Sequence, residues 1–447
     1  MVMRVLIFST TYFPFIGGAE IAVKEITDRV KSYQFDLITA RLSKKNLKTE
    51  KIGNVNVYRV GLGCKLDKYF LPILGCLKAK ELNKKYHYSL IWSISASQAG
   101  LAALFFKMKN SQIPFLLTVQ EGSSKKRMFK RRWMVWPLVK KIFKKADYIQ
   151  AISKFLADFS KEMGAKCPIK VIPNGVDVEK YGLPRIEETT DNHGLNENGL
   201  PRIEETTDNY GLKKKLGIKE NKRVIITVSR LVPKNGVGDL IKSLKYIDLP
   251  IKLLIIGVGP LGKKLKKLVK KLKIQDRVLF LGLVPPDEVP KYLAISDVFV
   301  RPSISEGFGN VFVEAMAVGV PIIGTPVGGI PDFLIDYNAN DANNNANDAN
   351  VNANYANYSC AADNSCGRIR VPDPDVHRGR LRYSHAANGL FCQPKNPKDL
   401  AEKIKQLLNN DNLRIQLGKN GRKLVEEKYD WGIIVKDIMQ IIQTLCR

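Results

Sequence analysis

Short apolar segments alternate with amphipathic segments along most of this 447-residue chain, and this alternation constrains the fold more than any other feature. Helical patterns separate the expected strands, which implies right-handed crossovers and parallel sheets. The sequence therefore predicts an α/β protein. The expected strands lie near 4–8, 35–40, 55–60, 89–95, 114–120, 148–153 and 169–173, and then near 224–229, 251–257, 278–282, 298–302, 321–325 and 389–393.

Two segments depart from the pattern. Residues 182–195 recur as 199–212 with one change, His193 against Tyr210. Residues 338–358 are almost entirely Asn, Ala, Asp and Tyr, with too little apolar surface to offset the entropy of ordering them. The predicted organisation is an N-terminal domain 1–181 joined by a C-terminal helix 431–447, a duplicated interdomain insertion 182–212, and a second domain 213–430 interrupted by an irregular or disordered insertion 337–387.

The charge balance is strongly basic, with 72 Lys and Arg against 43 Asp and Glu and a net charge of +29. Such a field attracts polyanions, which include nucleic acid and anionic lipid surfaces. The seven cysteines are odd in number and scattered, which favours reduced cytosolic thiols over a disulfide framework. Neither a signal peptide nor an apolar run of about 20 residues is visible. We therefore expect a cytoplasmic protein that is neither secreted nor integral to a membrane.

No metal site is expected. Cys360 and Cys366 could be combined with His377 and His385, but their spacing matches no usual zinc pattern and they lie in the second insertion.

The most informative motif is EGFGNVFVE at 306–314, which follows the strand near 298–302 and leads into a helical run from Asn310. A strand, a small-residue turn and a helix N-terminus expose backbone N–H groups that suit a phosphate or a sugar hydroxyl. Glu306 and Glu314 are eight residues apart, just over two helical turns. They can therefore contact different parts of one extended ligand.

Two other loops carry related signals. Arg230 and Lys234 follow the strand near 224–229, where a guanidinium fork and a point charge suit the oxygens of a diphosphate. Gly17 and Gly18 follow the first strand and open a helix. Residues 172–177, IPNGVD, close the first half. All of these glycine-containing loops are expected at the C-terminal ends of strands.

These blocks, in this order, resemble glycosyltransferase family 4, the retaining nucleotide-sugar enzymes of GT-B fold. The resemblance covers nearly the whole chain outside the insertions and includes residues 278–282, 328–332 and 429–431. It implies two doubly wound, Rossmann-like parallel-sheet domains facing a cleft. It also implies transfer of a sugar from a nucleotide-sugar to an acceptor hydroxyl with retained configuration, in the synthesis of cell-envelope polysaccharide, lipid-linked saccharide or glycolipid. The last helix would cross back onto the first domain.

The resemblance also implies roles for individual residues. Arg230 and Lys234 would bind the donor diphosphate, Glu314 the ribose, and Glu306 the donor sugar near its reacting carbon. Many members carry a histidine where this chain has Gln120, so the adjacent Glu121 is the catalytic candidate on the acceptor side, although it could simply cap a helix. Family members of this fold need no bound metal. The remaining expected donor-site residues are Gly17, Gly18, Gly257, Phe308, Gly309, Asn310 and Val311.

Three alternatives remain open. Residues 257–262 form a G-x-G-x-x-G after a strand, but the next strand ends in Gly282-Leu283 rather than the acid that a dinucleotide site requires. A catalytically inactive polyanion- or membrane-binding protein of the same fold is the second, and a nucleotide-sugar epimerase of similar fold is the third. Intact Arg230, Lys234 and both glutamates favour the transferase.

A basic and aromatic segment at 125–145 contains no acidic residue. Cations beside aromatic side chains favour an anionic bilayer surface, so we expect peripheral attachment to the cytoplasmic face of a membrane. In the alternative interpretation, residues 138, 139, 142 and 143 pack on the sheet instead. No recognised nucleic-acid module is present. The expected membrane contacts are Lys126, Arg127, Arg131, Arg132, Trp133, Trp136, Lys140, Lys141 and Lys144.

Overall fold

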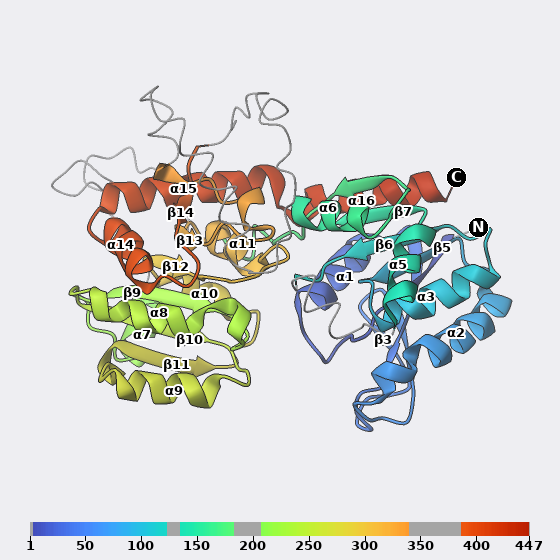
Figure 1. Ribbon diagram of the computed structural model, residues 1–447, viewed down its shortest axis with the longest axis horizontal. Coiled ribbons are helices and arrows are strands. Elements are labelled where there is room, and N and C mark those ends of the chain that lie inside the picture. The colour runs from blue at the N-terminus through green and yellow to red at the C-terminus, as the bar shows by residue number, and fades with distance from the viewer. Residues whose placement is uncertain (1–2, 123–134, 183–206, 339–385, 447) are drawn as a thin grey trace. The chain divides into compact units, whose positions relative to one another are not determined.

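A computed structural model describes residues 3–122, 135–182, 207–338 and 386–446 of the chain. It divides into two compact units (Figure 1), Met1–Gly175 with Lys428–Arg447, and Val176–Glu427. The second unit thus begins a few residues before the domain end expected at 181, which assigns Tyr181 to the second unit.

The first unit is built on an eight-stranded sheet of order β3-β4-β2-β1-β5-β6-β7-β8. All described pairings are parallel except β3 with β4, which is antiparallel. Strand β3 was missed by the sequence analysis because its residues TEKI carry no apolar run. The elements are β1 (Met3–Phe8), α1 (Gly18–Arg29), β2 (Tyr33–Ala40), β3 (Thr49–Ile52), β4 (Val55–Val60), α2 (Asp67–Tyr86), β5 (Leu90–Ile94), α3 (Gln98–Lys109), β6 (Phe115–Val119), α5 (Trp136–Lys145), β7 (Tyr148–Ala151), α6 (Lys154–Glu162), β8 (Ile169–Val171) and α16 (Trp431–Leu445).

Side chains of the central strands serve two cores, since successive strand residues point to opposite faces of a sheet. Val5 and Ile7 of β1 belong to a buried cluster formed with α1 and α16. Phe8 instead contacts Phe106 of α3, with ring centroids 6.3 Å apart. The C-terminal helix α16 is therefore a structural part of the first unit.

The second unit contains a six-stranded sheet of order β11-β10-β9-β12-β13-β14, in which every described pairing is parallel. The chain adds strands on one side of β9 and then, from β12, on the other. The loops after β9 and β12 consequently leave the same edge of the sheet in opposite directions. Ligands of doubly wound sheets bind at such a point. The elements are α7 (Thr207–Lys215), β9 (Arg223–Val228), η2 (Pro233–Asn235), α8 (Val237–Ser243), η3 (Leu244–Tyr246), β10 (Ile251–Ile256), α9 (Gly262–Lys271), η4 (Gln275–Arg277), β11 (Val278–Gly282), α10 (Val289–Ala294), β12 (Val298–Val300), α11 (Asn310–Ala317), β13 (Ile322–Gly324), η5 (Ile330–Asp332), β14 (Gly389–Phe391), α14 (Pro397–Leu408) and α15 (Asp411–Lys428).

The helices of the described residues were also searched for membrane spans. None of them combines the length and the apolar character needed to cross a bilayer.

Candidate functional site

The loops after β9 and β12 are joined to one another. Their strands are hydrogen-bonded neighbours, with Val298 opposite Ile225. The Ile304 N–H donates to the Lys234 carbonyl across 2.6 Å. Gly236 adopts φ 69°, and a Cβ there would lie 1.8 Å from the Pro302 carbonyl oxygen. Only glycine permits this approach, so the two loops form one surface.

A buried polar cluster occupies that surface. Arg301 and Glu306, each 8 % exposed, form an ion pair with Nη2 and Oε2 2.5 Å apart. The same Nη2 donates to Asn235 Oδ1 at 3.1 Å. Lys234 Nζ lies 3.9 Å from Glu306 Oε1, which also accepts from the Gly307 N–H at 3.1 Å. Glu306 is therefore fixed in place by groups from both loops.

The cluster carries excess positive charge. Arg301 and Lys234 together outweigh Glu306, and Arg230 adds a further, exposed guanidinium. Within the described part of the chain, no hydrogen bond or ion pair engages that guanidinium. A net positive surface lined by loop N–H groups is suited to a diphosphate.

Several buried polar atoms near these strand ends lack a hydrogen-bond partner among the described residues. They are Arg301 Nε and the hydroxyls of Thr227, Ser229 and Ser303. Unsatisfied buried polar groups are rare in proteins, and these four gather at the ends of neighbouring strands.

Glycines close the site around Glu306. Gly328 has φ 60°, and a Cβ there would lie 1.8 Å from the Glu306 carbonyl oxygen. Gly309 has φ 100° and ends the turn, after which α11 begins at Asn310. Phe308 is 2 % exposed and packs edge-on against Phe333 rather than facing solvent. The predicted donor binding by residues 308–311 consequently rests on their backbone N–H groups, which lie at the start of α11.

Glu314 lies one turn into α11 and is set in a different environment. Burial raises the pKa of its carboxyl to about 7, while a hydrogen bond from Tyr181 and the charges of Arg301 and Lys180 act in the opposite direction. Burial is the main cause and the negative charge of Glu314 the second cause that raise the pKa of the Tyr181 hydroxyl above its usual value. The hydroxyl therefore stays protonated and can donate a hydrogen bond. Arg301 therefore influences both carboxylates of the motif.

Tyr181 is held firmly. It is 9 % exposed, and its N–H donates to the Asp177 carbonyl at 3.1 Å. Arg422 Nη1 donates to the Tyr181 carbonyl at 3.2 Å and also to the carbonyl of Ala317, the last residue of α11. These bonds dock the start of the second unit onto the helix that carries Glu314.

Gly257 closes the neighbouring loop after β10. It adopts φ 126°, and a Cβ there would lie 2.0 Å from the Ser229 carbonyl oxygen. Its N–H donates to Gly282 at 2.6 Å. The loop thus packs directly beside the loop that carries Arg230.

The remaining candidates lie in the first unit. Gly17 caps α1 in an extended conformation and Gly18 is the first residue of that helix. Glu121 is half-buried just after β6. Each lies beyond the C-terminal end of a strand, as the sequence predicts.

The predicted membrane segment is described only in part. Lys126, Arg127, Arg131, Arg132 and Trp133 lie outside the described residues, as do Cys360, Cys366, His377 and His385. Trp136, Lys140, Lys141 and Lys144 lie on α5, whose apolar residues Val139, Ile142 and Phe143 are buried in the unit. Over the ranges that the structure describes, no three His, Cys, Asp or Glu side chains gather as metal ligands.

Two sequence profiles of known families match the chain. The profile described as glycosyl transferases group 1 matches residues 210–353 and 382–424, and the profile described as glycosyltransferase family 4 matches 16–180. The chain belongs to glycosyltransferase family 4.

Individual relatives agree with this family. A glycosyltransferase of Methanocaldococcus jannaschii is 26% identical over 100% of this chain and 99% of its own length. The alpha-monoglucosyldiacylglycerol synthase of Streptococcus pneumoniae is 26% identical over 72% of this chain and 70% of its own.

Solved structures show the same fold. Sucrose-phosphate synthase from Thermosynechococcus elongatus matches with a TM-score of 0.72 and 18% identity over 99% of both chains. Anabaena HepE in complex with UDP-glucose matches with a TM-score of 0.70 and 18% identity over 99% of this chain and 100% of its own. The glycosyltransferase therefore has the GT-B fold.

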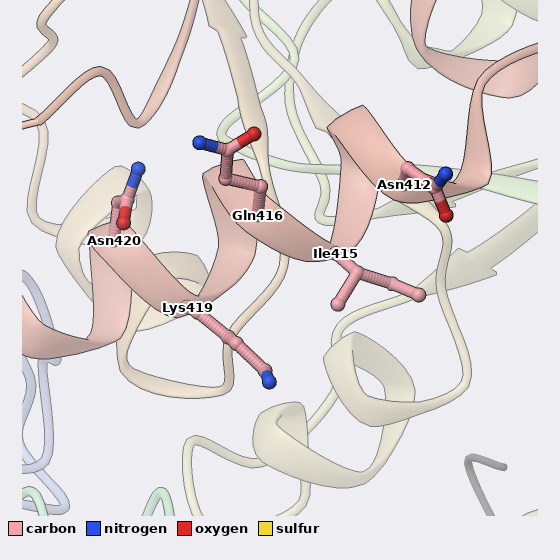
Figure 2. A pocket seen from close by; sticks show the side chains of 5 residues that line it. All are labelled: Asn412, Ile415, Gln416, Lys419 and Asn420. Atoms are coloured by element: carbon pink, nitrogen blue, oxygen red, sulfur yellow. The ribbon is translucent and has the colours of Figure 1, made fainter. Parts of the chain in front are cut away.

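A separate hollow on this glycosyltransferase lies along α15 (Figure 2), with a volume of ≈ 220 Å³. Its lining contains Lys419 but none of the predicted donor residues. We assign it no role. The lining residues are Asn412, Ile415, Gln416, Lys419 and Asn420.

Sequence reasoning missed three residues of the glycosyltransferase site. Arg301 had a local signal, because it directly follows the buried strand β12 and lies five residues before Glu306. Asn235 directly follows Lys234, but nothing in the local pattern assigns it a role. Tyr181 had no local signal, since nothing near it in the chain indicates contact with α11.

Proposed function

We propose that the protein transfers a sugar from a nucleotide-sugar to an acceptor hydroxyl, with retention of the anomeric configuration. The observation that carries the proposal is the cluster of Lys234, Arg301 and Glu306 on the joined loops after β9 and β12, with the exposed Arg230 on the same loop as Lys234. Its excess positive charge suits a diphosphate leaving group. A fixed carboxylate beside it suits a sugar hydroxyl.

The charge of the donor diphosphate grows as the nucleotide departs, so the cations would stabilise the transition state more than the ground state. Arg230 and Lys234 would contact the phosphate oxygens. Glu314 would accept hydrogen bonds from the ribose hydroxyls, and Gly257 would let its loop approach the nucleoside. We expect no resident metal to be required, because these side chains supply the positive charge.

We place the acceptor with the first unit, where Glu121 is the candidate to orient its hydroxyl. The net charge of +29 and the cations Lys140 and Lys144 on α5 favour an anionic membrane surface as the working location. The pneumococcal relative is named for a diacylglycerol lipid, which supports a lipid-linked or glycolipid acceptor. The proposed place is therefore the cytoplasmic face of a membrane.

Nucleotide binding and product analysis test the proposal together. A thermal-shift screen against UDP, GDP, ADP and their sugars should give stabilisation by one nucleotide series, because a ligand that binds only the native state raises its stability. NMR of the product formed from that donor should show the donor's own anomeric configuration. Stabilisation by no nucleotide, or an inverted linkage, would contradict the proposal.

A further inference from the structure

Helix α2 is apolar on two opposite sides. One side is buried in the first unit, with Leu71, Cys76 and Leu82 among its residues. The other side exposes the N-cap residue Leu66 at 60% and four helix residues at the spacing of one face, which are Tyr69 at 59%, Phe70 at 54%, Ile73 at 62% and Leu77 at 55%. A helix at a protein surface normally carries polar residues there. We call these five residues the α2 stripe.

The preceding loop extends this apolar surface and is ordered by hydrogen bonds. Leu62 is 83% exposed. The buried Asp67 carboxylate accepts from the Gly63 N–H at 2.7 Å and the Cys64 N–H at 3.1 Å. Gly63 has φ 94°, and a Cβ there would lie 2.8 Å from Lys44 Cα. The patch is therefore a built surface that brings Lys44 beside it.

Positive charge surrounds the α2 stripe. Lys68 Nζ lies 4.9 Å from the centre of the Tyr69 ring. Lys65 and Lys44 are exposed in the adjoining loops. The exposed acid on the next turn of the helix, Glu81, is paired with Lys78 at 2.6 Å.

A hollow with a volume of ≈ 320 Å³ lies directly beside the α2 stripe. Leu74 and Leu77 form part of its lining on the helix side, and Lys48 and Arg59 bring positive charge to it. Lys78 and Glu81 also line it and are paired with each other. The combination of an apolar ridge and a cationic hollow suits an amphiphile with a negative headgroup.

We propose that the α2 stripe enters the headgroup region of an anionic lipid bilayer, with the surrounding lysines meeting lipid phosphates. A bilayer supplies apolar depth and negative charge over one continuous surface, which is what this patch complements. A second copy of the chain would bring the same lysines against each other. The inference deepens the proposed membrane contact by adding a surface distinct from α5, and it rests on that proposal for its occupant.

Sedimentation with vesicles tests the inference on the full chain. Phosphatidylglycerol-containing vesicles should bind the protein more strongly than pure phosphatidylcholine, and added salt should weaken the difference. Phe70→Ser with Ile73→Ser should reduce binding by roughly tenfold or more, because two apolar side chains no longer leave water. Lys65→Gln and Lys68→Gln should each cost roughly fivefold on anionic vesicles only. Leu66→Ser with Leu77→Ser should repeat the apolar result.

Met108→Ser is the matched control, since Met108 is 52% exposed in the same unit but lies on α3. It should bind vesicles like the wild type, and every variant should keep the wild-type melting temperature and nucleotide-induced thermal shift. A triple variant, Lys140→Gln with Lys141→Gln and Lys144→Gln, tests α5 itself. Loss of vesicle binding by this triple variant, with unchanged binding by both double variants, would reject the α2 stripe and keep the α5 contact. No vesicle binding by the wild type would reject both. A wild-type dimer in light scattering that Phe70→Ser with Ile73→Ser separates would assign the stripe to a second copy instead.

Discussion

Arg301 links the two carboxylates on which the site depends. It pairs with Glu306 through Nη2 and lowers the pKa of Glu314 through its charge. A buried ion pair adds little net stability, because desolvation offsets its attraction, but it fixes orientation well. The family resemblance implies that Glu306 binds the donor sugar near its reacting carbon. The ion pair indicates an oriented hydrogen-bond acceptor whose charge is largely balanced.

Glu306→Gln should depress turnover while leaving nucleotide affinity nearly unchanged, because Arg230, Lys234 and Glu314 would still hold the nucleotide. It should also lower the free energy of unfolding by about 1–3 kcal/mol, since Arg301 loses its charged partner. Steady-state kinetics, calorimetric nucleotide titration and denaturant unfolding measure these effects. Full activity of Glu306→Gln would refute the assignment.

Arg230→Ala should weaken transition-state binding by about 10- to 150-fold, since it removes charge-assisted contacts worth roughly 1.5–3 kcal/mol. The exposed guanidinium has no structural role in the described residues, so the melting temperature should stay within error. The ratio kcat/KM for the donor is the measurement. Lys245→Ala, which removes another exposed cation of the second unit, is the control. An equal loss in both variants would show that the effect is general electrostatics.

The Glu314 carboxyl, with its pKa raised to about 7, should make nucleotide binding depend on pH. Ribose hydroxyls donate to the ionised carboxylate, so affinity should rise as the pH increases through about 7. A raised carboxyl pKa also means that the native state holds a proton that the unfolded state releases. Native stability from this group is therefore lost as the pH rises from the ordinary carboxyl pKa of 4.5 to about 7.

Glu314→Gln should remove this pH dependence, weaken nucleotide binding and chiefly raise the donor KM. The melting temperature of the variant minus that of the wild type should be larger at pH 8 than at pH 5. Tyr181→Phe removes one donor from the carboxylate and should move the binding midpoint to higher pH. Calorimetric titration across pH gives both results, with Tyr246→Phe as a control at an exposed tyrosine. Identical profiles for wild type and Tyr181→Phe would exclude Tyr181 from positioning Glu314.

At the scale of elements, the second insertion begins and ends at one place on the second unit. The Ile335 N–H donates to Asn388 Oδ1 at 2.9 Å, and the Asn388 N–H donates back to the Ile335 carbonyl at 3.1 Å. Asp336 forms a bridge with Gly389 beside β14. A short turn can therefore replace whatever lies between.

Deletion of residues 339–385 with a short glycine-serine turn should leave a folded protein with unchanged nucleotide affinity, because loop length has only a weak effect on closure entropy. The deletion keeps Asn338, which accepts from Gln406 at 3.2 Å. Thermal unfolding and nucleotide titration check both points. Insoluble protein or lost nucleotide binding would show that the insertion supports the domain.

At the scale of the whole molecule, the first unit is formed by two segments that are far apart in the chain, Met1–Gly175 and Lys428–Arg447. Trp431 at the start of α16 is 3% exposed and lies against Gly175, where a Cβ would approach its ring to 2.7 Å. Lys170 of β8 pairs with Asp437 of α16 at 2.9 Å. The last helix therefore covers a sheet formed by the first residues of the chain.

Trp431→Ala should lower the free energy of unfolding of the first unit by about 3–5 kcal/mol, because it leaves a cavity in that core. Ile433→Ala is the control, since Ile433 is 37% exposed on the same helix and should change stability little. Denaturant unfolding should show the loss. Nucleotide-induced stabilisation of the second unit should persist, and equal stability of both variants would contradict the structural role of α16.

Much of this architecture follows from local pattern. Alternating apolar and amphipathic segments determined the parallel α/β class, because strand and helix periodicity act within a few residues. The loop positions of Arg230, Lys234 and Glu306 and the helical position of Glu314 follow from the same pattern. The sequence missed β3, whose four residues pair at a sheet edge and need no apolar run.

Only the tertiary structure decided which of these residues meet. The strand order sets β9 beside β12 and so joins Lys234 to the Glu306 loop. Tyr181 reaches Glu314, and the α2 stripe faces solvent, through packing between segments far apart in the chain. Local periodicity shows that a helix has an apolar face, but burial depends on what the rest of the fold brings against it. On α2 the described fold covers one apolar face and leaves the other exposed.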